Sequence, residues 1–361
     1  MSSNGSDQAA GHAGSGLDSG SGPIAVAGAT GFVGSHVVAA LLGRGHAVRA
    51  LVRDASKAVK ILGSHEHLEI RTVTSLSPAG LGTKSRRLDP HSGRLRMDGP
   101  TTDANPLEGC SACVNCVGII REAPGGQTFD RVHVQVVEAL LQACEHARVG
   151  RFVQISATGV SPEGPSEYQT SKYEAEVMIR ASGLDWTIFR PGLIHGVGSE
   201  FIEMASAWSR AKAVPFVMLP YFTRFAEGKV LTTEAAEMEP VHVEDVAGAV
   251  ASSIERDGSI GEVYLLTGPE RLDWPTMLQT IRDAVPGGKP WMPTVGVPGK
   301  IAALQAKGAA IIGLRDALPF DEGMALMGSE DSVADPTKAR EHLGFEPRAF
   351  SASLATYSET V

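Results

Sequence analysis

Tyr168 and Lys172 are the side chains of this sequence with the clearest chemical capacity, and they stand four residues apart. On a helix this spacing places the phenol and the ammonium on one face. The ordinary pKa of a phenol is about 10, and a neighbouring ammonium lowers that pKa toward neutral pH. We therefore predict that Tyr168 exchanges a proton with a substrate oxygen, with Lys172 beside it.

Two hydroxyl side chains, Ser156 and Thr158, lie at and just beyond the end of the apolar segment 151–156, which is predicted to be a strand. A hydroxyl at this place can hydrogen-bond the same substrate oxygen as the tyrosine. We expect Thr158 to do so in preference to Ser156. The alternative is that either hydroxyl only caps a turn.

Three glycines, Gly28, Gly31 and Gly34, lie between an apolar run at 24–27 and an amphipathic run at 32–42. Strand, glycine turn and helix in this order predict a loop that binds the pyrophosphate of a dinucleotide. The glycines permit the turn, the close approach of the backbone and tight helix packing, and the helix N-terminus favours an anion. The alternative is an ordinary glycine-rich turn. The expected contacts are Gly28, Thr30, Gly31, Phe32, Val33 and Gly34.

Arg53 ends the second predicted strand, 46–53, at the place where an NAD enzyme carries an acidic residue for the adenosine ribose. A guanidinium at this place matches the 2′-phosphate of NADP with a planar set of donors. We therefore predict NADP as the cofactor. NAD is the alternative, with Arg53 a solvated surface residue and Asp54 bound to the ribose.

The elements that position these side chains alternate between strand and helix. Strands are predicted at 24–27, 46–53, 68–73, 112–118, 151–156 and 185–190, and helices at 32–42, 128–148 and 167–182. This alternation predicts a Rossmann-type α/β fold with a doubly wound parallel sheet. Ligands of such sheets bind beyond the carboxyl ends of the strands, so we expect Asn115, Val117 and Gly118 to pass beneath the cofactor.

The composition of the segments predicts the domain organisation. Residues 1–22 are small and polar, have no apolar core typical of a secretory signal, and are predicted to be a disordered leader. The dinucleotide-binding domain is predicted at 23–191, with an excursion or hairpin inserted at about 75–106. Residues 192–355 are predicted to form mainly a smaller C-terminal substrate lobe, with 241–268 returning to the main sheet.

The net charge of −9 argues against nucleic acid, or an anionic membrane surface, as a general partner. No uninterrupted apolar run is long enough to span a bilayer, because the best candidate, 301–318, is broken by Lys307, Arg315 and Asp316. We interpret this segment as a buried or surface amphipathic helix, rather than as a contact with a membrane or a partner. We expect a cytoplasmic protein.

Cys110, Cys113 and Cys116 have the spacing of a metal-binding loop. The segment 111–117 is nevertheless predicted to be a buried strand, on which residues three apart point to opposite faces. We therefore expect free buried thiols in a reducing compartment and no metal site.

Several motifs of the chain occur together in the order of a known family. They are 27–34, 114–121, Tyr168 with Lys172, 190–192, 241–246 and 341–347. Together they resemble the atypical and extended short-chain dehydrogenases/reductases, which include NAD-dependent epimerases and dehydratases. The resemblance extends over residues 23–355 and is greatest to the branch that contains the reductase-like accessory subunit of respiratory complex I.

The resemblance implies that Pro191 and Ile194 contact the nicotinamide end of the cofactor, where Lys172 can hydrogen-bond the ribose. It also implies that 242–246 supports the substrate lobe. Two positions depart from the family pattern. His133 stands where asparagine is frequent, and we expect it to be packed or bonded to the backbone. His195 replaces the usual tyrosine and is expected to be either a substrate contact or a loop residue.

These observations predict an NADP-dependent oxidoreductase that acts on a small carbonyl, alcohol or quinone-like substrate. The alternatives are a non-catalytic protein that holds NADP(H) in a respiratory-type complex, peripherally associated with a membrane, and a nucleotide-sugar epimerase. Apolar and aromatic residues of the second lobe predict either a hydrophobic substrate or the core of that lobe. They are Phe201, Met204, Trp208, Phe216, Phe222 and Phe225.

Overall fold

The computed structural model describes residues 22–82, 86–88, 95–97, 104–123, 125–227, 232–311, 318 and 320–361. The expected leader at 1–22 lies almost entirely outside the described residues, as do large parts of the expected insertion at 75–106.

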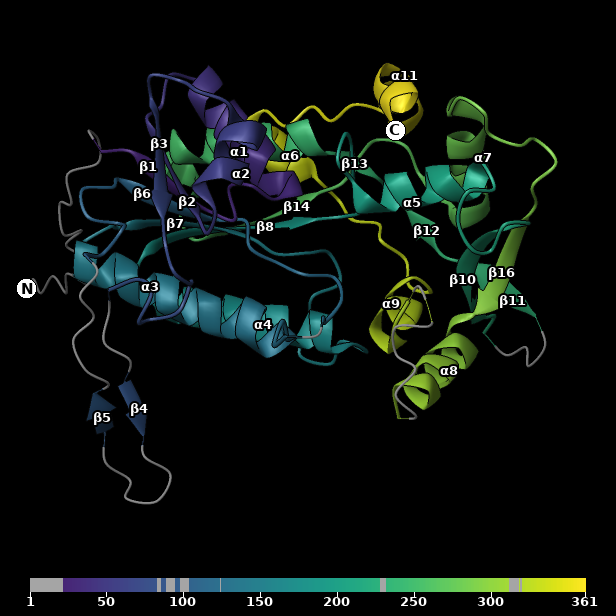
Figure 1. Cartoon of the computed structure of the whole chain (residues 1–361), viewed down its shortest axis with the longest axis horizontal. Coiled ribbons are helices and arrows are strands. Elements are labelled where there is room, and N and C mark those ends of the chain that lie inside the picture. Colours follow the sequence, from purple (N-terminus) through teal and green to yellow (C-terminus); the bar gives the residue numbers. More distant parts are fainter. Residues whose placement is uncertain are drawn as a thin grey trace, which may run out of the picture.

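A seven-stranded parallel sheet organises the larger part of the molecule (Figure 1). Its strands, in spatial order, are β14 (Glu262–Leu266), β8 (Asp185–Pro191), β7 (Arg151–Ile155), β6 (Ala112–Asn115), β1 (Ile24–Ala27), β2 (Val48–Val52) and β3 (Leu68–Thr72). The order runs outward from β1 in both directions, which confirms the predicted Rossmann-type doubly wound sheet.

Helices cover both faces of this sheet (Figure 1). One face carries α1 (Phe32–Gly43), α2 (Ala55–Leu62), α6 (Val243–Ile254) and α10 (Thr337–Leu343), and the other carries α3 (Val136–Ala147) and α4 (Glu167–Ala181). Side chains of β1 alternate between the two cores: Ile24 and Val26 pack toward α1, whereas Ala25 and Ala27 pack toward α3.

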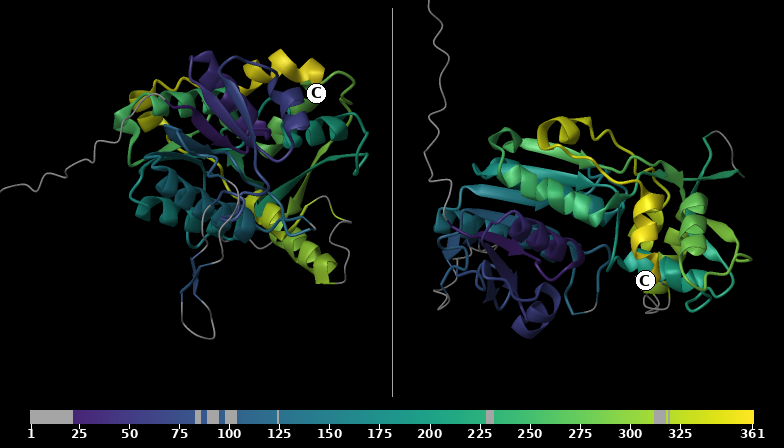
Figure 2. Two further views of the ribbon diagram at one scale, coloured as in Figure 1. Left: turned by 60° about the vertical axis from the view of Figure 1, so that its left-hand side comes forward. Right: turned by 90° about the horizontal axis from the view of Figure 1, so that it is seen from above.

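The segment between β3 and β6 contains a short antiparallel pair, β4 (Arg86–Leu88) and β5 (Leu95–Met97). This pair stands apart from the seven-stranded sheet in two views of the molecule (Figures 1 and 2). The chain therefore leaves the main domain after β3 and returns before β6.

The smaller lobe is built around the three-stranded sheet β11-β10-β16. Its elements are α5 (Glu200–Ser209), β10 (Leu219–Phe225), β11 (Thr233–Ala235), α7 (Trp274–Ala284), β16 (Thr294–Pro298), α8 (Gly299–Ile311), α9 (Glu322–Met327) and α11 (Phe350–Tyr357). Short strand pairs lie in the segments that join the two lobes: β9 (Ile194–His195) with β13 (Val241–His242), and β12 (Glu237–Met238) with β15 (Leu272–Asp273).

Most of the aromatic residues singled out in the second lobe form its own core. Phe201, Met204 and Trp208 pack with α7 and α11, and Phe222 packs with α8 and α9. For these four residues the core interpretation is therefore the correct one. Phe216 and Phe225 remain exposed. Late residues Ala339, Leu343 and Phe345 pack instead in the main core beside α1 and α6.

Cys113 and Cys116 face opposite sides of the main sheet, as the strand periodicity predicts. Cys113 belongs to the core on the α3 side, whereas Cys116 packs on the α1 side. All four cysteines are free. Within the described ranges, no group of three or more His, Cys, Asp or Glu side chains is arranged to hold a metal ion.

None of the helices in the described part of the chain is both long and apolar enough to cross a bilayer.

Candidate active site

The glycine loop joins β1 to α1 beside the end of β6. Gly28 has φ +77°, and a Cβ atom there would lie 3.0 Å from the carbonyl carbon of Cys116. A Cβ atom at Gly34 would lie 2.1 Å from the carbonyl oxygen of Gly28, closer than any side chain permits. Glycine is therefore required at both places, by a left-handed backbone and by close packing of helix on strand.

The first turn of α1 points its backbone N–H groups into this loop. Gly31 is the N-cap residue and provides no side-chain acceptor for them. These unpaired donors and the positive end of the helix dipole suit a bound pyrophosphate. Gly31 is exposed, while Thr30, Phe32 and Val33 are partly buried around it.

Arg53 follows β2 directly and is exposed, and it makes no hydrogen bond or ion pair with the described residues. The Asp54 carboxylate accepts a hydrogen bond of 3.0 Å from the backbone N–H of Lys57 and caps α2. One carboxylate oxygen of Asp54 is thus engaged by the helix, whereas the Arg53 guanidinium has no partner among the described residues.

The end of β6 supplies the floor of the site. The Asn115 side chain is fully buried: its Nδ2 donates to Gln154 Oε1 (2.9 Å) and its Oδ1 accepts from the backbone N–H of Val117 (3.1 Å). This pair of bonds fixes the turn that follows the strand. Gly118 then opens directly toward Lys172, because a Cβ atom at Gly118 would lie 3.5 Å from Lys172 Nζ.

Lys172 is buried within α4 and reaches across to the strand ends. Its Nζ donates to the carbonyl oxygen of Ile155 (3.4 Å) and lies 5.4 Å from the ring centroid of Tyr168. Burial lowers the pKa of Lys172 to about 8, and the negative charge of Glu176 opposes this shift. The structure thus brings Tyr168, Lys172 and Gly118 together at the carboxyl edge of the sheet.

The expected lowering of the Tyr168 pKa does not occur in this structure. Burial instead raises the pKa of Tyr168 above its usual range. The reason is that desolvation disfavours the phenolate, and the lysine ammonium lies over the ring rather than against the hydroxyl. Tyr168 is therefore neutral at physiological pH, which suits a proton donor.

Glu176, one helical turn after Lys172, is a fully buried carboxylate that the sequence did not reveal. Its Oε1 accepts hydrogen bonds from Ser156 Oγ (2.6 Å) and Arg190 Nε (2.8 Å). Its Oε2 accepts from Arg190 Nη2 and Arg180 Nη2, both at 2.7 Å. The only sequence signal was its place on the same face of the helix as Tyr168 and Lys172.

The two hydroxyls expected to meet the substrate are engaged with the protein. Ser156 Oγ donates a hydrogen bond to Glu176 Oε1, and Thr158 Oγ1 donates one to the backbone carbonyl of Arg190 (3.1 Å). Ser156 is buried, whereas Thr158 is partly exposed.

His133 lies against the ring of Tyr168, with 5.4 Å between the ring centroids. It belongs to a π-helical turn, η1 (Asp130–Gln135), that precedes α3. Its Nε2 accepts from the backbone N–H of Ile119 (3.2 Å), so its Nδ1 carries the proton and donates to Ser171 Oγ (2.9 Å). Burial, and next to it the charge of Lys172, lowers the pKa of His133 to about 2.

Pro191 is buried at the end of β8, and Ile194 is partly buried in β9. His195 is fully buried, and its Nδ1 hydrogen-bonds Tyr357 Oη at 2.9 Å. It also contacts the rings of His242 and Phe350. His195 is therefore a core residue between the lobes rather than a loop residue on the surface.

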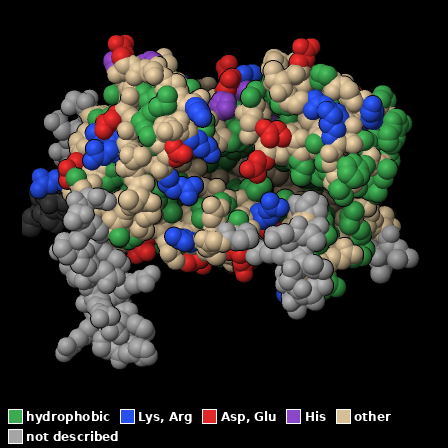
Figure 3. All heavy atoms as spheres, viewed as in Figure 1, with side chains coloured by type: hydrophobic (Ala, Val, Ile, Leu, Met, Phe, Trp, Pro, Cys, Tyr) green, Lys and Arg blue, Asp and Glu red, His purple; other side chains and the backbone are tan. Residues whose placement is uncertain are grey.

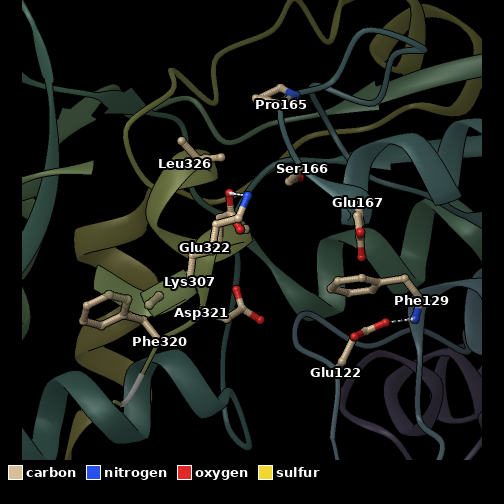
Figure 4. Close-up of a pocket in the computed structure, with 12 residues that line it drawn as sticks. Glu122, Phe129, Pro165, Ser166, Glu167, Lys307, Phe320, Asp321, Glu322 and Leu326 are labelled. Carbon is tan, nitrogen blue, oxygen red and sulfur yellow. Dashed lines mark hydrogen bonds and ion pairs between the residues drawn. The ribbon is translucent and has the colours of Figure 1, made fainter. Parts of the chain in front are cut away.

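A cleft of about 540 Å³ opens between the start of α4 and the α8–α9 part of the smaller lobe (Figure 4). Phe129 lines it, and the Phe129 ring lies 6.0 Å from the Tyr168 ring. Phe320 and Leu326 face it from the smaller lobe. Carboxylates line the same cleft, and Lys307 pairs with Glu322 there at 3.9 Å. Phe129 therefore lies between the cleft and the Tyr168 ring.

Fold and site together define a dinucleotide-binding protein of the short-chain dehydrogenase/reductase type. The chain belongs to the NAD dependent epimerase/dehydratase family, whose model matches residues 24–266. The family match and the glycine loop support binding of a nicotinamide dinucleotide, NAD or NADP.

Two curated relatives illustrate the range of the family. NADH dehydrogenase [ubiquinone] 1 alpha subcomplex subunit 9, mitochondrial, of Rattus norvegicus is 28% identical over 143 residues, 40% of this chain and 34% of the relative. Across the four relatives with this name, the chain covers only 34% to 44% of their length. Ceramide reductase of Caulobacter vibrioides is 28% identical over 285 residues, 78% of this chain and 76% of the relative.

A solved structure has the same fold over nearly the whole chain. UDP-glucuronic acid 4-epimerase from Bacillus cereus, in complex with NAD, superposes with a TM-score of 0.61 and 18% identity. The match covers 93% of this chain and 97% of that one. At this identity the likeness establishes the fold.

The neutral state of His133 predicts a measurable sensitivity to acid. The pKa of His133 in the folded chain is about 2, below the ordinary value of 6.5. Between these pH values the imidazole is protonated in the unfolded chain and neutral in the folded chain. We expect the free energy of unfolding of the wild type to fall by roughly 2 kcal/mol more than that of His133→Asn between pH 7 and about pH 4.5. Urea unfolding at both pH values measures this difference.

Asparagine at this position keeps an acceptor for the Ile119 N–H. The matched control is His65→Asn, at an exposed position, which should keep the wild-type pH dependence. Equal acid sensitivity of the wild type and His133→Asn would show that His133 is not held neutral.

Proposed function

We propose that the protein is an NADP(H)-dependent reductase in which Tyr168 gives a proton to the oxygen of a carbonyl substrate. The observation that carries this proposal is the neutral Tyr168 phenol held beside Lys172 and Gly118 at the carboxyl edge of the sheet. A nicotinamide dinucleotide bound there supplies hydride for the carbonyl carbon. A proton donor next to the acceptor oxygen completes the requirements of carbonyl reduction.

Each of the neighbouring side chains has one part in this proposal. As the carbonyl π electrons move onto oxygen, Tyr168 Oη releases its proton to that oxygen and becomes a phenolate. The Lys172 ammonium lies over the ring, 5.4 Å from its centroid, and its charge offsets part of the cost of burying this phenolate. Solvent then returns a proton to Tyr168.

The protonation states support the direction of reduction. The raised pKa keeps Tyr168 protonated before the step. With a pKa of about 8, Lys172 is still mainly cationic at neutral pH, and the carboxylate of Glu176 favours that form. When the dinucleotide is bound, Lys172 is also the group that would hold the nicotinamide ribose, with Pro191 and Ile194 beside the nicotinamide.

The hydroxyls take different parts. Ser156 acts as a positioning residue, because its hydroxyl donates a hydrogen bond to the buried Glu176 carboxylate. Thr158 is partly exposed, and its oxygen can accept a hydrogen bond while its hydroxyl donates to the backbone carbonyl of Arg190. We assign Thr158 as a contact of the substrate.

The cleft supports a substrate whose carbonyl is attached to an apolar body. Phe129, Phe320 and Leu326 offer apolar contacts in the cleft, and the Phe129 ring lies 6.0 Å from the Tyr168 ring. One relative that matches over most of its length is a ceramide reductase by name, which agrees with an apolar substrate. A nucleoside diphosphate sugar is disfavoured, because Glu122, Asp321 and other carboxylates of the cleft would repel its phosphates.

Replacing Arg53 tests the choice of NADP. In Arg53→Ala we expect the Kd for NADPH to rise about tenfold or more, with the Kd for NADH unchanged, because a charge-assisted bond to the 2′-phosphate is lost. Isothermal titration calorimetry measures both constants. Lys60→Ala removes an exposed cation of the neighbouring helix α2; it is the control and should change neither constant. An equal loss of affinity for NADPH and NADH in Arg53→Ala would contradict the assignment.

Replacing the phenol tests the proton donor. In Tyr168→Phe we expect kcat for the reduction of a quinone or aliphatic ketone probe to fall by about 100-fold or more, with NADPH affinity retained. The measurement is the loss of NADPH absorbance on mixing. Tyr173→Phe, one position past Lys172 on the same helix, is the control and should keep wild-type turnover.

Full turnover in Tyr168→Phe would refute this mechanism. A wild-type protein that binds NADPH tightly, yet oxidises it with none of the ketone and quinone probes, would instead favour the cofactor-holding alternative.

A further inference from the structure

The smaller lobe exposes four large apolar side chains in two loops. Val214, Phe216 and Val217 lie between α5 and β10, and Trp291 lies between α7 and β16. Their exposed fractions are 63%, 53%, 58% and 62%. Neither the cofactor loop nor the cleft beside Tyr168 uses them. Single exposed apolar residues are ordinary, but a group of large ones marks an interaction surface.

Strand pairing places the two loops side by side. β10 and β16 are parallel neighbours, with Leu219 opposite Thr294, so the segments that precede them emerge at the same edge of the sheet. The backbone N–H of Leu219 donates to the carbonyl of Pro293 (2.8 Å), which continues this pairing into the loops. The space-filling view shows apolar side chains gathered over this lobe (Figure 3).

The bases of both loops are fixed by hydrogen bonds to the end of α5. Trp208 Nε1 donates to the carbonyl of Val214, and the backbone N–H of Lys289 donates to the carbonyl of Ser209, each at 2.8 Å. The exposed side chains are thus held on ordered loops. A rigid apolar surface needs less ordering on binding than a mobile one.

Two cations flank the apolar side chains. Lys212 and Lys289 are exposed, and neither forms an ion pair with the described residues. The chain as a whole has a net charge of −9, so unpaired lysines beside an apolar group are a local exception. We call Lys212, Val214, Phe216, Val217, Lys289 and Trp291 the loop-edge surface.

We propose that the loop-edge surface docks the protein on a lipid bilayer that contains anionic phospholipids. Trp291 and Phe216 have the form of interfacial anchors, since aromatic rings favour the boundary between acyl chains and headgroups. The two lysines extend their alkyl stems along the apolar surface and place their ammonium groups among the anionic headgroups. Side chains that project from two loops can insert into the headgroup region of a bilayer, whereas they would fit poorly against a flat protein surface.

Vesicle sedimentation of the full chain tests this proposal. The probes are vesicles of phosphatidylcholine alone and of phosphatidylcholine mixed with phosphatidylglycerol. We expect the wild type to sediment with the mixed vesicles and Phe216→Ser/Trp291→Ser to bind them about tenfold more weakly. Lys212→Gln/Lys289→Gln should lose the preference for the mixed vesicles, and added salt should weaken wild-type binding.

The matched control is Val59→Ser, a half-exposed apolar residue on α2 of the main domain, which should bind like the wild type. Thermal unfolding and NADPH affinity, unchanged in every variant, show that the fold is intact. Wild-type protein that fails to sediment with either vesicle would overturn the proposal. So would a dimer, found by light scattering, that the Phe216→Ser/Trp291→Ser variant abolishes, because the surface would then join two copies of the chain.

Discussion

The buried carboxylate of Glu176 is the constraint on which the rest of the site depends. A fully buried charge is tolerated only when it is paired and hydrogen-bonded, and Glu176 receives four such bonds. Their donors come from three elements: Ser156 at the end of β7, Arg180 on α4 and Arg190 on β8. The carboxylate therefore ties the helix that carries Tyr168 and Lys172 to two strand ends of the sheet.

This arrangement explains the protonation states around Tyr168. Lys172 is too deeply buried to keep an ordinary pKa, and the charge of Glu176 limits the fall. The ammonium of Lys172 in turn helps burial to keep His133 neutral, so that His133 can accept the Ile119 N–H and hold the turn after Gly118. The Glu176 carboxylate thus favours the charged form of Lys172, and the charge of Lys172 favours the neutral form of His133 beside the Tyr168 ring.

The sequence was sufficient for those parts of the site whose residues are close together along the chain. The glycine loop combines a turn, a strand and a helix within one short segment, and Tyr168 and Lys172 share one helix face. The parallel sheet followed from the alternation of strands and helices. The sequence order also predicted that Cys113 and Cys116 lie on opposite faces.

The parts that could not be predicted depend on contacts between distant segments. The bonds of Ser156 and Arg190 with Glu176 form only when β7, α4 and β8 are packed together. The direction of the Tyr168 pKa shift depends on burial, which residue spacing alone does not determine. The π-helical turn at His133 and the hydrogen bond of His195 with Tyr357 are likewise results of tertiary packing.

A double-mutant cycle between Glu176 and Arg190 tests most directly whether this buried pair joins helix to sheet. Glu176→Gln leaves the guanidinium of Arg190 without its anion, and Arg190→Met removes two of the four hydrogen bonds to the buried Glu176 carboxylate. Removing one partner of a fully buried ion pair costs about 3–5 kcal/mol, and less where the partner is partly exposed, as Arg190 is. The free energies of unfolding should therefore be non-additive, with the double variant less destabilised than the sum of the single ones by about 2 kcal/mol or more. Additive losses would contradict the account, because they would show that Glu176 and Arg190 do not act as a pair that holds α4 against β8.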